Sequence, residues 1–200
     1  MGPQVLPEAR LDQDRPARGL TAAKVLIVNA DDFGHSTEVN AGVIRAHEHG
    51  IVTSTSLMVR RPAVDEAVAY ARSRPQLAVG LHLELEGAAA EVEAQLERFV
   101  ALVGRNPTHL DSHHHAHLRE PARSAVIDAG RRLGVPVRHF DPRVRYMGSF
   151  YGQTGIAAED LCAIVRSLED GITELGCHPA VGAVPGSSYS TEREQELAAL

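Results

Sequence analysis

The chain has 200 residues, of which 44% are hydrophobic and 23% charged, and this balance predicts a globular protein with a substantial core. A chain of this length is enough for one domain and too short for two ordinary ones. The net charge of −6 and an aromatic content of only 4% argue against nucleic acid as a partner, because phosphate backbones need clustered basic residues and unpaired bases need stacking platforms.

Simple features of the sequence indicate where the protein works and where its fold begins. Cys162 and Cys177 show neither a disulfide framework nor a CxxC metal motif, which favours a reduced, cytoplasmic setting. No apolar run approaches the length of a membrane span, so none is expected. Residues 1–22 contain proline and arginine but no apolar signal core, and we interpret them as a disordered leader before a single domain at 23–200.

The first half of that domain predicts three strand–helix units in succession. Each unit has a short apolar or β-branched run, followed by a segment with apolar residues at helical spacing. The predicted strand and helix pairs are 24–28 with 36–49, 53–59 with 62–73, and 78–85 with 91–103. Ser36 is suited to cap the first of these helices, and Gly50 follows its end.

The second half continues the alternation. The predicted elements are a strand at 108–112, a helix to about Leu133 before Gly134, a strand at 135–140, a helix around 161–168, a strand at 173–177 and a final helix from Thr191, where Glu194 fits a capping box. No hairpin signal interrupts the series, so the fold class is α/β with mostly parallel strands.

The kind of parallel sheet is harder to predict than the class. No glycine-rich phosphate loop follows the first strand, so an open nucleotide-binding sheet loses its usual support. A complete eight-unit barrel needs about 250 residues. A barrel formed by this chain would therefore be an irregular or incomplete (β/α) barrel of the TIM-barrel type.

Polar residues collect at the carboxyl ends of the predicted strands. Asp31 and Asp32 follow the first strand, His82 lies in the third, and His178 follows the last. In parallel α/β folds these ends share one face, where ligands bind. Each residue also has a plain structural interpretation: the two acids can form a turn, His82 can be a hydrogen-bonded core residue, and His178 can be an ordinary loop residue. Their convergence favours a functional site.

The segment HLDSHHHAH at 109–117 holds five of the eleven histidines. It is either a metal site, a histidine run without function that only resembles a purification tag, or a polar surface strand. A tag would be terminal, and a solvated surface does not need so many imidazoles, so a metal role is favoured. If the strand ran straight, alternation would place one set of side chains on the same side: His109, Asp111, His113, His115 and His117. One carboxylate and two imidazoles would hold a catalytic metal, leaving a second acid free as general base.

Six motifs in this order resemble the YdjC-like carbohydrate deacetylase family, which includes chitooligosaccharide deacetylases and a hopanoid-biosynthesis-associated branch. They are NADDFG (29–34), GIVTSTSLMV (50–59), GLHL (80–83), PTHLDSHHHAH (107–117), SFYG (149–152) and CHPA (177–180). The resemblance implies an irregular (β/α) barrel that removes an N-acetyl group from an acetylated amino sugar with one divalent metal ion, zinc or magnesium.

Carried over by position, the resemblance implies a role for each of nine residues. Asp32, His82 and His113 would be metal ligands, Asp31 the general base, and His178 the residue that stabilises or protonates the departing amine. The substrate-binding set would comprise His115, His117, Phe150 and Tyr151, with the two histidines also able to orient ligands.

The sequence also departs from the family pattern. The connection at 85–90 is shorter than in family members, and the chain stops soon after the CHPA motif. These differences leave two alternatives to deacetylation: hydrolysis of a glycosidic or phosphoester bond with the same ligands, or a non-catalytic protein that binds sugar or metal. A homodimer that covers exposed sheet edges is a further possibility.

Overall fold

The structure, a computed structural model, describes residues 23–85 and 90–200. The predicted leader at 1–22 and most of the predicted short connection at 85–90 lie outside the described residues. Six parallel strands form one sheet in the order β4-β3-β2-β1-β6-β5. Their bounds are β1 (Lys24–Phe33), β2 (Ser54–Leu57), β3 (Ala78–Leu83), β4 (Leu110–Ser112), β5 (Val144–Met147) and β6 (Gly171–Cys177).

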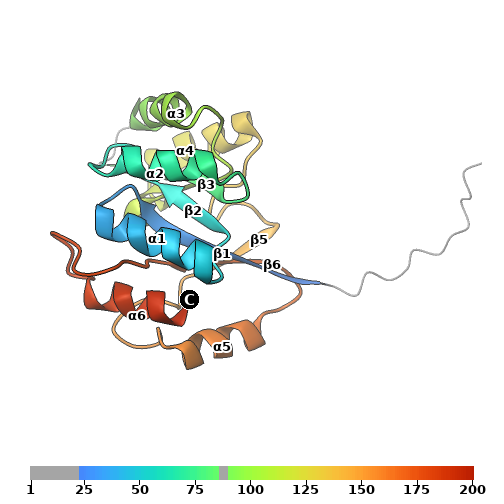
Figure 1. The fold of residues 1–200 in the computed structure, drawn as a ribbon. Coiled ribbons are helices and arrows are strands. Elements are labelled where there is room, and N and C mark those ends of the chain that lie inside the picture. The colour runs from blue at the N-terminus through green and yellow to red at the C-terminus, as the bar shows by residue number, and fades with distance from the viewer. Residues whose placement is uncertain (1–22, 86–89) are drawn as a thin grey trace, which may run out of the picture.

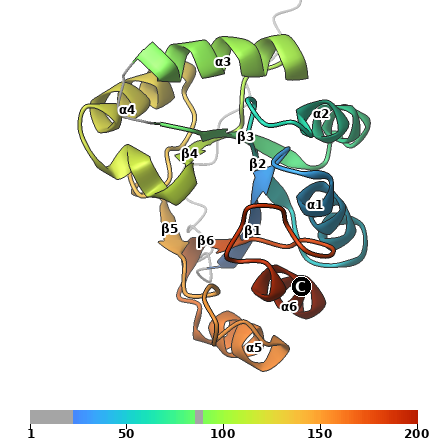
Figure 2. The ribbon, with the colours of Figure 1, turned by 90° about the vertical axis from the view of Figure 1, so that its left-hand side faces the viewer.

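The sheet curls into an incomplete barrel with helices on its outside (Figures 1 and 2), which confirms the predicted fold class. The helices are α1 (Thr37–His49), α2 (Val64–Ser73), α3 (Ala90–Val103), α4 (Ala122–Leu133), α5 (Ala158–Ser167) and α6 (Thr191–Ala199), with a 3₁₀ segment η1 (His113–Leu118). Apolar residues from the strands and from the inner helix faces form one core. No helix among the described residues is both long and apolar enough to span a membrane.

Two of the predicted helix ends have the expected chemistry. The Ser36 hydroxyl accepts a hydrogen bond from the Val39 amide at 3.3 Å, as an N-cap should. α4 ends at Gly134, whose φ of 68° is the left-handed conformation that glycine adopts without strain. The capping box predicted at Thr191 is wrong. Ser190 is the N-cap of α6 and makes no side-chain cap, and Glu194 accepts instead from the Gly182 amide at 2.9 Å.

The strand predicted at 135–140 is also wrong. Only Val137 bridges to Leu110 of β4, through two backbone hydrogen bonds of 3.0 Å that involve Pro136 and Arg138. His139, with a φ of 69°, and a turn that returns from Phe140 to Val137 then end the extended conformation. The regular strand is β5, which comes a few residues later and pairs with β6.

One close packing contact fixes the segment that follows β6. A Cβ atom added at Gly42 of α1 would lie only 2.4 Å from the Cα atom of Ala180. Glycine is therefore required where α1 meets this turn. The contact places His178, two residues before Ala180, at the carboxyl edge of the sheet.

Candidate metal and catalytic site

The two acids at the end of β1 both reach one site because the strand is irregular there. Consecutive residues of a regular strand point to opposite faces. The register of β1 against β2 shifts between Ala30 and Phe33, and Asp32 has a φ of 67°. A non-glycine residue in this conformation costs about 1 kcal/mol or more, and such strain occurs often at functional sites. The irregularity turns Asp31 and Asp32 toward the same space, as a turn at this strand end predicts.

Asp32, His82 and His113 come together as a group that could hold a metal ion. Each offers one ligand atom, and these atoms all lie within 4.8 Å of one another. The Asp32 Oδ1 atom is 3.3 Å from His82 Nε2 and 3.1 Å from His113 Nδ1. One carboxylate and two imidazoles, the last partly exposed, are the ligand types and number of an open catalytic zinc site. The residues present therefore fit a divalent cation.

The second ring nitrogen of His82 faces a carboxylate. His82 Nδ1 is 2.8 Å from Asp111 Oδ1, and Asp111 Oδ2 accepts from the Ser56 hydroxyl at 2.6 Å. Burial disfavours the charged imidazole, but Asp111 and Asp32 outweigh it and raise the pKa of His82 to about 10. A metal ligand must be the neutral imidazole, so cation binding at this site releases a proton. Asp111 fixes the ring with Nε2 toward Asp32.

Arg138 binds three carboxylates next to the candidate metal group. It holds both oxygens of Asp31, at 2.7 and 2.8 Å, and its Nη2 atom lies 2.7 Å from both Asp111 and Glu174. Burial opposes the ionisation of Asp31, yet Arg138 brings its pKa below the usual value. Asp31 and Asp111 also form a possible metal group with His82, but the guanidinium already bridges these two acids.

A second buried arginine contacts the candidate metal group. Arg193 of α6 donates to Asp32 Oδ2 at 2.6 Å, which leaves Oδ1 toward the two histidines. Burial opposes the ionisation of Asp32, but hydrogen bonds from His113 and His82, together with Arg193, hold its pKa well below the usual value. Asp31, Asp32 and Asp111 outnumber Arg138 and Arg193 by one charge, and protonated His82 balances this difference; a bound cation would take the place of that proton.

His178 lies beside Asp31, the predicted general base. Its Nε2 atom is 3.8 Å from Asp31 Oδ2, and its side chain is 19% exposed. Burial lowers the pKa of His178 to about 4, so the imidazole is neutral at neutral pH. Its backbone amide donates to Glu196 Oε2 at 2.5 Å.

These groups open into a cavity of about 510 Å³ at the carboxyl ends of the strands. Tyr151, half exposed, stacks on Tyr189 with ring centroids 4.3 Å apart, and it meets the His178 ring edge to face with centroids 5.1 Å apart. His115 and Tyr146 form another part of the wall. The cavity thus has a polar end with carboxylates and imidazoles, and an aromatic side with Tyr146, Tyr151 and Tyr189.

Two residues of the predicted substrate-binding set are buried away from the cavity. Phe150 is in the apolar core, with no exposed surface. His117 is also fully buried; its Nδ1 atom is 2.6 Å from Ser112 Oγ and its Nε2 atom 3.1 Å from the Arg138 carbonyl oxygen. Neither side chain can contact a substrate in this arrangement. His117 instead connects the end of β4 to the segment that carries Arg138.

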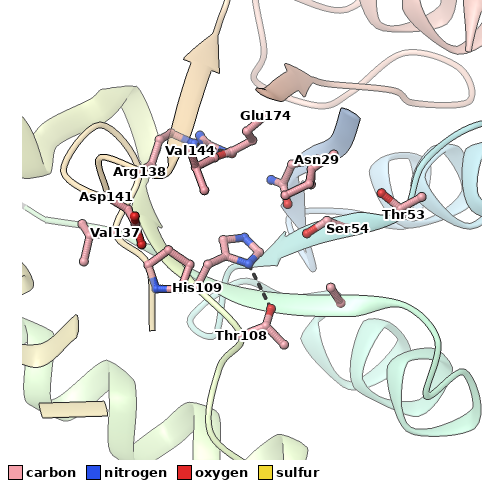
Figure 3. A pocket seen from close by; sticks show the side chains of 13 residues that line it. Asn29, Thr53, Ser54, Thr108, His109, Val137, Arg138, Asp141, Val144 and Glu174 are labelled. Carbon is pink, nitrogen blue, oxygen red and sulfur yellow. Dashed lines mark hydrogen bonds and ion pairs between the residues drawn. The ribbon is translucent and has the colours of Figure 1, made fainter. Parts of the chain in front are cut away.

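The expectation of a straight strand through 109–117 is wrong. β4 ends at Ser112 and the chain enters η1, where His114 and His115 have positive φ values. The histidines consequently separate: His113 joins the metal group and His115 the cavity wall. His109 lies at the opposite end of the barrel, with Asn29, Arg138 and Glu174 around a second cavity of about 230 Å³ (Figure 3).

Several site residues were missed by sequence reasoning. Arg138, Arg193, Tyr189 and Glu196 all contact the predicted residues directly. Arg138 falls inside the segment predicted as a strand, where a charged residue in an apolar run is a weak signal. Arg193 and Glu196 lie on a helix whose sequence is mostly polar, so no pattern distinguishes them from solvated residues.

The comparisons with known proteins give the family. The family model described as YdjC-like protein matches residues 25–90 and 85–200, which is nearly all of the chain that the structure describes. The chain belongs to the YdjC-like family. Its two matched stretches meet at 85–90, where the sequence predicts a shortened connection.

YdjC-like relatives are similar over most of their length. A carbohydrate deacetylase of Geobacillus stearothermophilus is 36% identical and covers 87% of this chain and 88% of the relative. That alignment has 217 positions, against about 174 residues of this chain, so about 40 positions have no counterpart here. A chitooligosaccharide deacetylase of Klebsiella pneumoniae (strain 342) is 34% identical and covers 88% and 90%.

Solved structures show the same fold. A protein of Enterococcus faecalis V583, described as a candidate cellobiose-phosphate cleavage protein, has a TM-score of 0.74 and 28% identity, covering 88% of this YdjC-like chain and 90% of the other. A family 4 carbohydrate esterase of Streptomyces lividans has a TM-score of 0.53 and 14% identity, covering 89% and 84%. The second likeness concerns the fold alone.

Proposed function

We propose that this YdjC-like protein is a carbohydrate deacetylase, which hydrolyses the N-acetyl group of an amino sugar to acetate and a free amine. The observation that carries the proposal is the position of Asp31. It is a carboxylate separate from the metal ligands, yet it lies at the same strand end, with His178 3.8 Å away. Amide hydrolysis needs such a base and a proton donor for the departing nitrogen.

Asp32, His82 and His113 would hold one divalent cation. When bound, such a cation acts as a Lewis acid that polarises a carbonyl oxygen and lowers the pKa of water. Two imidazoles and one carboxylate favour zinc over magnesium, which prefers oxygen ligands.

The chain's own groups then manage one proton. Asp31, kept ionised and oriented by Arg138, accepts a proton from the attacking water. His178 is neutral, so it does not bring a proton from solvent; it receives one from Asp31 and passes it to the departing nitrogen. An amine anion is a very poor leaving group, and this transfer is what allows the C–N bond to break.

The cavity supports a sugar as the group that carries the acetamide. Tyr151 offers an exposed ring beside His178, and His115 lines the same cavity. Relatives at 34% and 36% identity are named chitooligosaccharide deacetylase and carbohydrate deacetylase. An acetylated amino sugar or a short oligosaccharide is therefore the proposed substrate.

Glycosidic cleavage is the second candidate, because the similar Enterococcus faecalis protein is described in connection with cellobiose-phosphate cleavage. That reaction generally needs one carboxylic acid in its protonated form opposite a carboxylate. Among the acids of the cavity end, Asp31 and Asp32 both have a lowered pKa and bind guanidinium groups. Neither is suited to be the acid, which favours deacetylation.

The biological setting is proposed from weaker observations. Cys162 and Cys177 are both free thiols, which fits a reduced cytoplasm. A homodimer stays a prediction, based on the edge strands of the sheet, β5 and β4, the second of which is bridged only at Leu110 to Val137.

The test is acetate release from N-acetylated chitobiose by zinc-loaded and chelator-treated protein, with reducing-sugar formation measured in parallel. Acetate released only by the loaded protein, in the absence of new reducing ends, is the expected result. New reducing ends would support the glycosidic candidate, and a protein that retains metal but turns over neither bond would be a binding protein.

A further inference from the structure

Glu196 of α6 uses both carboxylate oxygens on groups of the candidate site. Its Oε2 atom accepts from the His178 amide, and its Oε1 atom accepts from the Tyr189 hydroxyl, each at 2.5 Å. The side chain is fully buried. A buried carboxylate is costly unless its oxygens are hydrogen-bonded, and here both partners belong to the site.

The two partners of Glu196 are connected through a third residue. Tyr189 stacks on Tyr151 with an interplanar angle of 23°, and Tyr151 meets His178 edge to face. The Tyr189 hydroxyl also accepts from the Gly152 amide at 3.1 Å, next to Tyr151 in the chain. Glu196 therefore lies behind a closed set of contacts that contains the proposed proton donor and the exposed aromatic ring.

The same helix holds the set from a second position. Arg193 donates to the Tyr189 carbonyl oxygen at 2.9 Å and to Asp32 at 2.6 Å. α6 thus reaches a metal ligand through Arg193, and the proton donor and the tyrosine pair through Glu196. These contacts fix the distances between the three groups.

We propose that Glu196 is a positioning residue, which fixes the position of His178 relative to the Tyr151–Tyr189 pair. A sugar ring bound on the pair would then present its acetamide group to His178. The expected effect of Glu196 on catalysis rests on the proposed function. The positions of His178 and the tyrosine pair do not. Glu196 does not touch substrate and acts only through its two partners.

Only a carboxylate can accept both of the hydrogen bonds that are directed at residue 196. Two donors point at Glu196, and a carboxylate has an acceptor oxygen for each. A glutamine in its place has one acceptor oxygen, and its NH₂ group would face the other donor. Removing the Tyr189 hydroxyl eliminates one donor, so a glutamine could then serve the His178 amide alone.

The experiment is a cycle of Glu196→Gln, Tyr189→Phe and the double variant, with Glu194→Gln as control. Glu194 is exposed on the same helix and holds only a loop amide, so its variant should match the wild type. For Glu196→Gln we expect kcat/KM on acetylated chitooligosaccharide to fall about tenfold to a hundredfold, the range for a lost charged hydrogen bond. Tyr189→Phe should mainly raise KM, and the double variant should recover kcat relative to Glu196→Gln.

A second readout is independent of turnover. The His178 amide proton, bonded to a carboxylate at 2.5 Å, should resonate far downfield in an NMR spectrum of the zinc-loaded protein. It should move upfield in Glu196→Gln and partly return in the double variant. Metal content should be equal in all four variants.

Any of three results would overturn the inference. The first is an unchanged chemical shift of the His178 amide proton in Glu196→Gln, and the second is wild-type kinetics in that variant. The third is a fall in kcat/KM of the double variant that equals the product of the falls in the two single variants. If the wild type releases no acetate but the amide shift follows the cycle, the proposed function fails and the positioning role of Glu196 stands.

Discussion

Arg138 holds both carboxylate oxygens of Asp31, at 2.7 and 2.8 Å, from a segment 107 residues later in the chain. The same guanidinium reaches Asp111 and Glu174. One side chain therefore keeps ionised, in a buried place, both the proposed general base Asp31 and Asp111, the partner of His82.

Replacing Arg138 with Met should damage both stability and activity. Three buried acids would lose their counter-charge, and breaking a buried ion pair costs about 3–5 kcal/mol of the free energy of unfolding. Urea unfolding measures this cost. Arg132→Met is the matched control, because Arg132 pairs with Glu93 at 2.8 Å on the surface and should change stability by less than about 1 kcal/mol. An equal loss in the free energy of unfolding for Arg138→Met and Arg132→Met would contradict the role of Arg138 in holding the buried acids.

Replacing Asp111 with Asn should weaken metal binding by about tenfold to a hundredfold, the usual effect of losing a carboxylate behind a ligating histidine. The amide keeps the shape but not the charge that orients His82. Competition with a chelating dye measures the dissociation constant of zinc. Asp128→Asn, on the exposed face of α4, should leave that constant unchanged. An unaltered constant in Asp111→Asn would remove Asp111 from the metal site.

Replacing His113 with Ala should abolish both metal retention and acetate release, since it removes one of three ligands. His114→Ala is the neighbouring comparison. His114 is exposed and lies outside the ligand group, so its variant should keep one metal ion per chain by elemental analysis. Full activity in metal-free His113→Ala protein would end the metal hypothesis.

The pH dependence of the free energy of unfolding should show the effect of the lowered pKa of His117. Burial lowers its pKa from 6.5 to about 4, so the unfolded chain takes up a proton at a pH where the folded protein does not. The stabilisation is complete above pH 6.5 and is lost as the pH falls toward 4, by up to about 3 kcal/mol. His117→Asn, which cannot titrate, should lose less stability than the wild type between pH 7 and pH 4. Parallel stability curves for the two proteins would contradict this account.

Much of the barrel could be predicted from the sequence because its strand–helix units are locally complete. Ser36 and Gly134 set helix ends by their own chemistry. The grouping of Asp32, His82 and His113 could be predicted as well, because parallel strands bring their carboxyl ends together whatever the details of packing; their role as metal ligands stays a prediction.

The parts that could not be predicted depend on partners distant in sequence. The histidine segment bends because His117 is bound by Ser112 and by the Arg138 backbone, so the spacing of its imidazoles gives no straight strand. Arg138 and Glu196 have a role only where the curled sheet and α6 bring them to Asp31 and His178. Periodicity within one segment contains no such information.

The bridge between Leu110 and Val137 has a consequence for the whole molecule. It is the short backbone seam that joins β4 to the segment before β5, and Arg138 is its next residue. Pulling this seam apart would leave Asp31 and Asp111 repelling each other in a place with no water to screen them. We therefore expect closure of the half-barrel and assembly of the candidate site to be a single cooperative event, in which amide exchange at Leu110 and Arg138 is as slow as global unfolding.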